Sequence, residues 1–245
     1  SVNNPMEYYD VNVSGTISLL EAMTANQVNK IIFSSSATVY GNSRKLPFDE
    51  TRRLNPQNPY GRTKLMVENI IRDWAKQRVG NKSASLRYFN PVGAHETGLI
   101  GEDPNDMPAN LMPYICQVAL GQIPFLSVFG SDYPTRDGSG ERDFIHVTDL
   151  ANAHIRVAEK IEELPSYLAL NIGTGQGTTV FELIKTFEKV NRKKIPFKIE
   201  GRRLGDVAQS VADPSLSLKL LQIKCNHSIK DMCRHSWNWQ KQYKL

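Results

Sequence analysis

The sequence is poor in cysteine and contains no long hydrophobic run. Its 245 residues include only three cysteines, an odd number, and they are widely spaced. This usage predicts reduced thiols in a cytosolic protein rather than a disulfide framework. The apolar runs are far shorter than the roughly 20 residues that a membrane-spanning helix needs, and no signal-peptide pattern is present. We therefore expect a cytoplasmic protein with no membrane partner.

Charge is not concentrated on any stretch. The net charge of +5 arises from 30 basic and 25 acidic residues, and the basic residues are scattered among acids. Because no basic stripe interleaved with aromatics appears, we expect no nucleic acid partner. The five histidines show no metal-ligand spacing with one another or with cysteine, so structural roles and no metal site are predicted.

A dinucleotide fingerprint is also missing. Gly173–Gly177 comes nearest, but its glycines have the wrong spacing and no acidic residue follows about 20 positions later. We interpret this stretch as a tight turn before a helix. Since the sequence starts at Ser1 rather than Met, the simplest expectation is that the amino-terminal βα units of the fold are missing.

Hydrophobic periodicity predicts alternating helices and strands along the chain. The first part reads as helix 6–25, strand 30–34, a helix that begins at Tyr60, and strand 85–89. The later elements expected are helix 110–120, a strand or turn at 144–147, helix 149–163, strand 168–172, helix 179–190, strand 196–200, and helices 214–222 and 228–243. This order predicts an α/β protein with a Rossmann-like doubly wound parallel sheet and a smaller mixed α/β lobe.

Hydroxyl side chains follow the first predicted strand. Ser34–Ser36 and Thr38 lie at its carboxyl end, where open α/β sheets bind their ligands. Tyr60 and Lys64 stand four residues apart on the next helix, so they share one face. A cation close to a tyrosine lowers the pKa of the phenol, which can then exchange a proton with a substrate hydroxyl. The spacing therefore predicts an acid–base tyrosine whose pKa is lowered by Lys64.

Three stretches carry a resemblance to a known family when they are taken together. Residues 34–41, 59–64 and 87–95 read SSSATVYG, PYGRTK and RYFNPVGAH. The likeness continues through NLMP at 110–113, FGSDY at 129–133, GERD at 140–143, RRLGD at 202–206 and WNWQ at 237–240. The chain resembles the extended short-chain dehydrogenase/reductase family over essentially its whole length. Within that family it is most similar to the NAD-dependent enzymes of galactose metabolism that interconvert UDP-glucose and UDP-galactose at C4.

The resemblance implies a division of roles among the residues. Tyr60 matches the catalytic tyrosine, Lys64 the lysine that lowers its pKa and bonds the nicotinamide ribose, and Ser36 the hydroxyl between the tyrosine and sugar O4, with Thr38 close by. The positions that match cofactor-binding residues are Asn12, Ser36, Tyr60, Lys64, Tyr88 and Phe89. Asn12 matches less securely, because Val11 replaces a second asparagine that the family usually carries.

On the substrate side, the resemblance implies a UDP-sugar pocket. The matching positions are Asn90, Asn110, Leu111, Phe129, Arg142, Arg203, Asp206 and Ser210. The planar guanidinium groups of Arg142 and Arg203 suit a diphosphate. Ala109 and Leu204 depart from the usual asparagine and glutamate. Ser210 is small where some relatives carry tyrosine, which leaves room beside C2 of the sugar and predicts that UDP-GlcNAc and UDP-GalNAc are also interconverted.

The domain organisation implied is therefore twofold. Residues 1–90 form the remainder of the NAD-binding domain, to which 143–172 returns, and residues 91–142 and 173–245 form the UDP-sugar-binding lobe. The resemblance also implies a homodimer. Two alternatives stay open: a related nucleotide-sugar dehydratase, which needs an acid pair beside the tyrosine where this chain has Ser36-Ala37-Thr38, and an inactive fragment that only binds UDP-sugar or requires its missing amino-terminal part.

Overall fold

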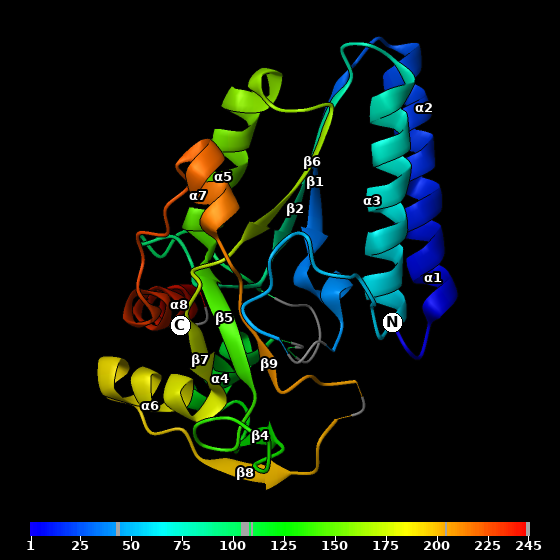
Figure 1. Cartoon of the computed structure of the whole chain (residues 1–245). Coiled ribbons are helices and arrows are strands. Elements are labelled where there is room, and N and C mark those ends of the chain that lie inside the picture. Colours follow the sequence, from blue (N-terminus) through cyan, green and yellow to red (C-terminus); the bar gives the residue numbers. More distant parts are fainter. Residues whose placement is uncertain (43–44, 104–107, 109, 204, 244–245) are drawn as a thin grey trace. The chain divides into compact units, whose positions relative to one another are not determined.

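The computed structural model describes residues 1–42, 45–103, 108, 110–203 and 205–243, so Ala109 and Leu204 lie outside the described residues. The chain divides into two compact units (Figure 1). Unit 1 is built from Ser1–Phe89, Asn152–Ile172 and Ala212–Ile223, and unit 2 from Asn90–Ala151, Gly173–Val211 and Lys224–Leu245. Among the described residues, no helix has the length and apolar character needed to cross a membrane.

A parallel three-stranded sheet forms the centre of unit 1. Its strands run in the order β1 (Lys30–Ser36), β2 (Lys82–Tyr88) and β6 (Tyr167–Ile172). The register pairs Ser36 with Tyr88 and Tyr88 with Ile172, so the three carboxyl ends finish at one edge. All three strands were expected, with β2 starting three residues earlier than predicted. The parallel order confirms the α/β class with a Rossmann-like sheet.

Helices α2 (Gly15–Ala25) and α3 (Pro59–Gln77) pack against this sheet. Their buried side chains meet Ile31 and Phe33 of β1 and Tyr167 of β6. The helix expected over 6–25 is present, but a π-helical turn at Asp10–Ser14 separates α1 (Pro5–Tyr9) from α2. The extra residue in that turn shifts the helical phase, and Ile17 on the following turn of α2 is 42% exposed.

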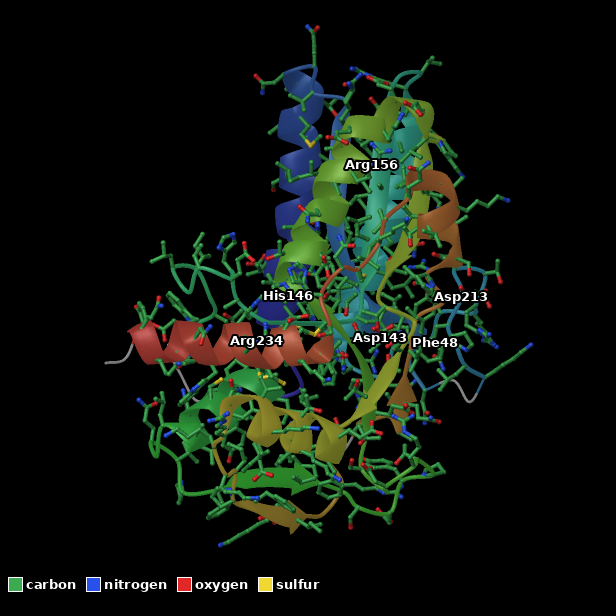
Figure 2. The ribbon with its side chains drawn as sticks, turned by 90° about the vertical axis from the view of Figure 1, so that its left-hand side faces the viewer. Phe48, Asp143, His146, Arg156, Asp213 and Arg234 are labelled. Carbon is green, nitrogen blue, oxygen red and sulfur yellow. The ribbon has the colours of Figure 1, made fainter. Side chains whose placement is uncertain are left out.

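Two segments from later in the chain complete unit 1. Helix α5 (Val147–Lys160) leads towards β6, and α7 (Ser215–Leu221) follows the return of the chain at Ala212. The Asp213 N–H donates to the Phe48 carbonyl oxygen (2.8 Å), and Arg156 Nε donates to the carbonyl oxygen of Leu221 (3.0 Å). Phe48 and Asp213 are labelled beside each other, and Arg156 on α5, in Figure 2.

Unit 2 is a mixed α/β body with its own core. Strand β5 (Glu141–His146) pairs with β3 (Asn90–Val92), β7 (Gly177–Thr179) and β9 (Gln209–Ser210), and β4 (Leu126–Phe129) pairs with β8 (Phe197–Glu200). Helices α4 (Leu111–Ala119), α6 (Val180–Asn191) and α8 (Ile229–Tyr243) bury apolar side chains against these strands. Strands β3, β4, β7 and β9 were not expected from the sequence, because two to four residues are too short to show a periodicity.

The glycine-rich loop before α6 is a turn, as interpreted from its spacing. The N–H groups of Thr174 and Gly175 both donate to the carboxylate of Asp143, at 2.9 Å each. Gly175 adopts a positive φ of 75°, which glycine tolerates without strain. The loop therefore wraps a carboxylate of its own chain, and it offers these two N–H groups to Asp143 rather than to a phosphate.

A buried ion pair joins the elements of unit 1. Glu68 on α3 and Arg87 on β2 have side-chain exposures of 0% and 3%, and Arg87 Nη2 lies 2.6 Å from Glu68 Oε2. Ser35 of β1 donates to the same carboxylate (2.5 Å), and Arg87 donates to the Tyr40 hydroxyl (3.2 Å). Tyr40 in turn donates to Asn171 of β6 (2.6 Å). A single network thus fixes α3 relative to all three strands.

Replacing Glu68 with glutamine should strongly destabilise unit 1. The substitution keeps the shape but leaves the Arg87 charge buried without its counter-charge, which costs about 3–5 kcal/mol of unfolding free energy. Chemical denaturation measures this loss for the whole protein, and hydrogen exchange of the β1 and β2 amides measures it for unit 1. The control is Glu162→Gln, which removes an exposed carboxylate that pairs with Lys30 and should change little. Equal behaviour of the two variants would contradict the importance of the buried pair.

Candidate active site

The first candidate site lies at the carboxyl ends of the unit 1 strands. The Asn58 side chain caps α3 by accepting from the Gly61 N–H (2.8 Å), and Pro59 occupies the first helical turn. A side chain at Gly61 would come within 3.0 Å of the Thr38 carbonyl oxygen, so only glycine lets the helix start this close to the residues after β1. This close approach brings Tyr60 next to Ser36.

A chain of hydroxyl groups connects the predicted catalytic residues. Thr38 Oγ1 and the Thr38 N–H donate to Ser36 Oγ, at 3.0 and 3.2 Å. A side-chain hydrogen bond between Ser36 and Tyr60 lowers the pKa of the phenol, against the larger effect of burial. The side chains of Thr38, Ser36 and Tyr60 therefore form one hydrogen-bonded chain of hydroxyl groups.

The pKa of Tyr60 does not follow the expectation from its spacing to Lys64. Burial raises the pKa of the phenol, the nearby Tyr88 and Tyr8 raise it further, and only the hydrogen bond from Ser36 opposes them. Lys64 Nζ lies 5.5 Å from the centre of the Tyr60 ring and donates to the Ser34 carbonyl oxygen (3.0 Å). The predicted lowering by Lys64 is therefore wrong for this arrangement, because the ammonium group points at the strand and desolvation dominates.

Lys64 nevertheless keeps free hydrogen-bonding capacity. Burial lowers its pKa, and the Ser34 carbonyl is its only hydrogen-bond acceptor among the described residues. Two of its three N–H donors are thus available to a ligand hydroxyl at this edge of the sheet. Tyr88 is the last residue of β2 and is in register with Ser36, and Phe89 follows it. Asn12 is held on the π-helical turn by donating to Thr63 Oγ1 (2.9 Å).

The second candidate site is a cavity of about 440 Å³ within unit 2, a size typical of ligand pockets. Seven of the eight substrate-side residues expected from the sequence line it: Asn90, Asn110, Leu111, Phe129, Arg142, Arg203 and Asp206. The eighth, Ser210, is not among the lining residues, but on β9 it is in register with Arg142 of β5. Paired residues of neighbouring strands point to the same face, so Ser210 lies beside Arg142.

The electrostatics of this cavity favour an anion. Arg142 donates to the backbone carbonyl oxygen of Glu141 (2.8 Å), and burial lowers the pKa of its guanidinium group. No described carboxylate forms an ion pair with Arg142, so its charge is available to a ligand. Arg203 instead pairs with Asp206 (3.0 Å) and stacks over the Phe129 ring, 4.6 Å from its centre. The cavity thus combines a cation, an aromatic face and a carboxylate, which suit a diphosphate, a base and a diol.

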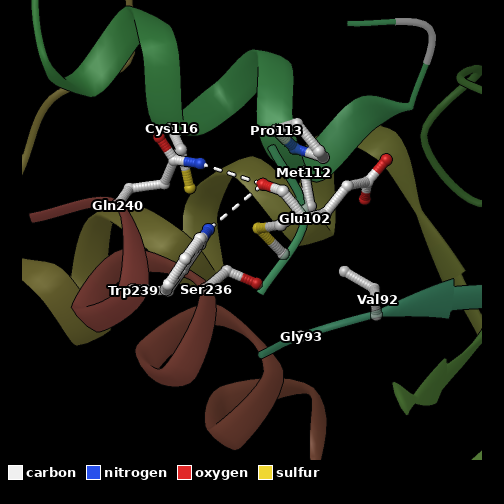
Figure 3. Close-up of a pocket in the computed structure, with 9 residues that line it drawn as sticks. All are labelled: Val92, Gly93, Glu102, Met112, Pro113, Cys116, Ser236, Trp239 and Gln240. Carbon is white, nitrogen blue, oxygen red and sulfur yellow. Dashed lines mark hydrogen bonds between the residues drawn. The ribbon is translucent and has the colours of Figure 1, made fainter. Parts of the chain in front are cut away.

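A second cavity of unit 2 is too small for a substrate. It offers about 10 Å³, the space of one water molecule, between β3, α4 and α8 (Figure 3). Trp239 and Gln240 of α8 both donate to the Glu102 carbonyl oxygen across it, at 3.1 and 3.3 Å. These bonds close the space, so it serves packing.

Three histidines meet in unit 2, which their spacing in the sequence did not reveal. Ring nitrogens of His146, His227 and His235 lie within 4.8 Å of one another, a separation that could suit a metal ion. However, the Thr148 N–H donates to His146 Nδ1 (3.0 Å), so the neutral ring carries its proton on Nε2 and donates it to His235 Nδ1 (3.0 Å). A metal at His146 Nε2 would displace a proton that Nδ1 cannot accept. The hydrogen bonds therefore favour a structural role.

The parallel sheet, the Tyr60–Lys64 helix and the arginine-containing cavity are features of the extended short-chain dehydrogenase/reductase class. Residues 1–173 match the NAD dependent epimerase/dehydratase family, and the chain belongs to this family. It is 50% identical over 237 residues to a UDP-glucose 4-epimerase of Dictyostelium discoideum, covering 96% of this chain and 69% of that protein. A UDP-glucose 4-epimerase of Bacillus subtilis (strain 168) is 50% identical over 240 residues, covering 98% and 71%.

Solved structures agree with the sequence comparison. A crystal structure of UDP-glucose-4-epimerase from Stenotrophomonas maltophila, with bound NAD and formylated UDP-arabinopyranose, matches with a TM-score of 0.97 and 50% identity. A second, from Bifidobacterium longum in complex with NAD+ and UDP, matches with a TM-score of 0.95 and 47% identity. Each match covers 100% of this chain and 73% of the solved one.

We expect the histidine cluster to make the folded protein less stable in mild acid. Burial, together with His227 and His235, lowers the pKa of His146 from 6.5 to about 4. Between pH 6.5 and about 4, His146 is therefore protonated in the unfolded chain but neutral in the folded chain. Its contribution to the free energy of unfolding is complete above pH 6.5 and is lost as the pH falls towards 4. One proton corresponds to a slope of about 1.4 kcal/mol per pH unit.

Denaturant unfolding at a series of pH values measures this slope. His146→Asn keeps an acceptor for the Thr148 N–H but cannot titrate. It should reduce the slope of unfolding free energy against pH by the contribution of one proton. His95→Gln is the matched control, because His95 bonds only Thr97 at the surface among the described side chains. An unchanged slope in His146→Asn would show that other groups cause the acid sensitivity.

Proposed function

We propose that this protein interconverts UDP-glucose and UDP-galactose by NAD-dependent, reversible 4-epimerisation, as in galactose metabolism. The observation that carries the proposal is the hydroxyl chain from Thr38 through Ser36 to Tyr60 beside Lys64, in a chain about 50% identical to UDP-glucose 4-epimerases. A single phenol that can accept and return a proton is what reversible oxidation of a sugar hydroxyl needs.

The residues of unit 1 fit the cofactor of the family. Lys64, with two free N–H donors, would hold the nicotinamide ribose, while Tyr88, Phe89 and Asn12 would lie on the cofactor side. When bound, NAD supplies a hydride acceptor and donor, so that C4 is oxidised to a ketone and reduced again from the opposite face. The division of the chain into a cofactor-binding unit 1 and a sugar-binding unit 2 belongs to this proposal.

The protein's own groups carry the proton and hold the substrate. Tyr60 accepts the proton of the 4-hydroxyl group, and Ser36, with Thr38 behind it, donates to the phenol oxygen as negative charge develops there. Arg142 and Arg203 hold the diphosphate, Phe129 stacks on the base and Asp206 accepts from the ribose diol. Strong binding of UDP lets the hexose be held loosely, so that either face of C4 can be presented.

A related dehydratase remains the competing activity within the family. Elimination of water requires an acid beside the catalytic tyrosine, and here the position after Ser36 is Ala37, followed by Thr38. The carboxylate of Glu68, which is buried in this unit, already bonds Arg87 and Ser35. These hydroxyl groups support epimerisation over dehydration.

The proposed assembly is a homodimer formed through unit 1. An open apolar groove of about 450 Å³ runs between α2 and α3 and is lined by Ile17, Leu20, Ile70 and Trp74, among others. The two helices lie side by side in Figure 1. An exposed apolar groove of this kind supports a protein–protein contact. A cytosolic location is part of the same proposal, supported by the reduced cysteines.

Tyr60→Phe should lower the rate by about 10²–10⁴-fold or more, because it removes the group that accepts the proton. The assay is the conversion of UDP-galactose to UDP-glucose at saturating NAD, with UDP affinity measured in parallel to show that the fold and the substrate pocket remain. Tyr9→Phe, which removes a tyrosine hydroxyl on α1, is the control. Turnover by Tyr60→Phe within about tenfold of the parent would exclude Tyr60 as the acid–base residue.

Ser210→Tyr should abolish the interconversion of UDP-GlcNAc and UDP-GalNAc while keeping that of the plain UDP-hexoses. The family resemblance places Ser210 beside C2 of the sugar, so the tyrosine ring would fill the space that an acetamido group needs, and a packed site has little slack for both. Initial rates on both substrate pairs measure the effect, with Ser210→Ala as the small-residue control. Equal loss on both pairs, or no N-acetyl activity in the parent, would disprove the proposed substrate range.

A further inference from the structure

Tyr133 carries a buried hydroxyl group that makes no hydrogen bond to the described residues. The residue is 7% exposed and lines the large cavity of unit 2 together with Arg142. Its Oη atom is buried and has no hydrogen-bond partner among the described residues. A buried donor without a partner costs about 1–3 kcal/mol of folding free energy, so phenylalanine at this position would make the ligand-free protein more stable.

The ring of Tyr133 is held in place from several sides. The Arg202 guanidinium group stacks over it, 4.3 Å from the ring centre, and is itself fixed by Asp132 (2.7 Å). The Tyr133 N–H donates to the Gly138 carbonyl oxygen (2.8 Å). Gly130 has a positive φ of 82°, and a side chain there would come within 2.6 Å of the ring edge. These contacts fix the ring, and with it the position of the hydroxyl group, in a residue that lines the cavity.

We infer that the Tyr133 hydroxyl donates a hydrogen bond to the diphosphate of a bound nucleoside diphosphate, on the same phosphoryl oxygens that Arg142 attracts. This inference rests on the proposed function, which places a UDP-sugar in this cavity. Arg142 has no ion-pair partner among the described carboxylates, and it lines the same cavity as Tyr133. A hydroxyl donor with no hydrogen-bond partner among the described residues, in the same cavity as a guanidinium group with no ion-pair partner there, matches an anionic oxygen, which accepts several hydrogen bonds.

The family resemblance of the sequence includes Tyr133 without assigning it a role. Tyr133 ends the stretch FGSDY, which contributed to the family resemblance, but only Phe129 of that stretch was assigned to the pocket. Composition and spacing cannot show that a tyrosine hydroxyl is buried without a partner. The three-dimensional structure was needed to single it out.

Calorimetric titration with UDP and with uridine tests the inference. Tyr133→Phe should raise the Kd for UDP roughly tenfold or more, the size of one hydrogen bond to a charged group, and should leave the Kd for uridine unchanged. Its thermal midpoint should not fall, because the substitution removes an unpaired buried group.

The control is Tyr243→Phe, which removes a tyrosine hydroxyl from α8 outside the cavity and should bind UDP as the parent does. Unchanged UDP affinity in Tyr133→Phe would overturn the inference while leaving the proposed function in place. An equal loss for UDP and uridine would also overturn it, because the donor would then reach the nucleoside. A parent protein that binds no UDP would overturn the proposed function and this inference with it.

Discussion

The buried ion pair between Glu68 and Arg87 is the constraint on which unit 1 depends. Two opposite charges with almost no solvent exposure are tolerated only when each is fully hydrogen-bonded, and here Ser35 and Tyr40 supply the remaining partners. Because Glu68 lies on the same helix as Tyr60, the network fixes the depth and rotation of α3. The position of the phenol beside Ser36 is therefore a consequence of a salt bridge two helical turns away.

Electrostatics separate the two candidate sites in character. In unit 1, desolvation raises the pKa of the Tyr60 phenol and lowers that of the Lys64 ammonium group. In unit 2, Arg142 remains a cation with no ion-pair partner among the described residues, while Arg203 is already paired with Asp206. One site thus suits proton exchange and the other suits the binding of an anion, and the two tasks fall in separate compact units.

The sequence predicted the longer elements, and seven of the eight residues expected on the substrate side line one cavity. Helices α3, α4, α6 and α8 and strands β1, β2 and β6 lie within a few residues of where their periodicity placed them. The short strands β3, β4, β7 and β9 were not predicted. Whether two to four residues form a strand depends on their pairing with a strand that is distant in the sequence. The Tyr60 pKa was also wrongly predicted, because spacing along a helix says nothing about burial or about where an ammonium group points.

The sequence by itself determined which chemistry the chain offers: hydroxyls after a strand, a tyrosine and a lysine four residues apart, and arginines in family motifs. These are local facts, set by residue type and by the helical repeat. Only the tertiary structure decided which groups are satisfied. It paired Glu68 with Arg87, placed the Asp143 carboxylate against the glycine-rich loop, brought three distant histidines together, and left the Tyr133 hydroxyl with no hydrogen-bond partner among the described residues. Hydrogen-bond satisfaction depends on residues far apart in the chain, and their contacts exist only once the core has formed.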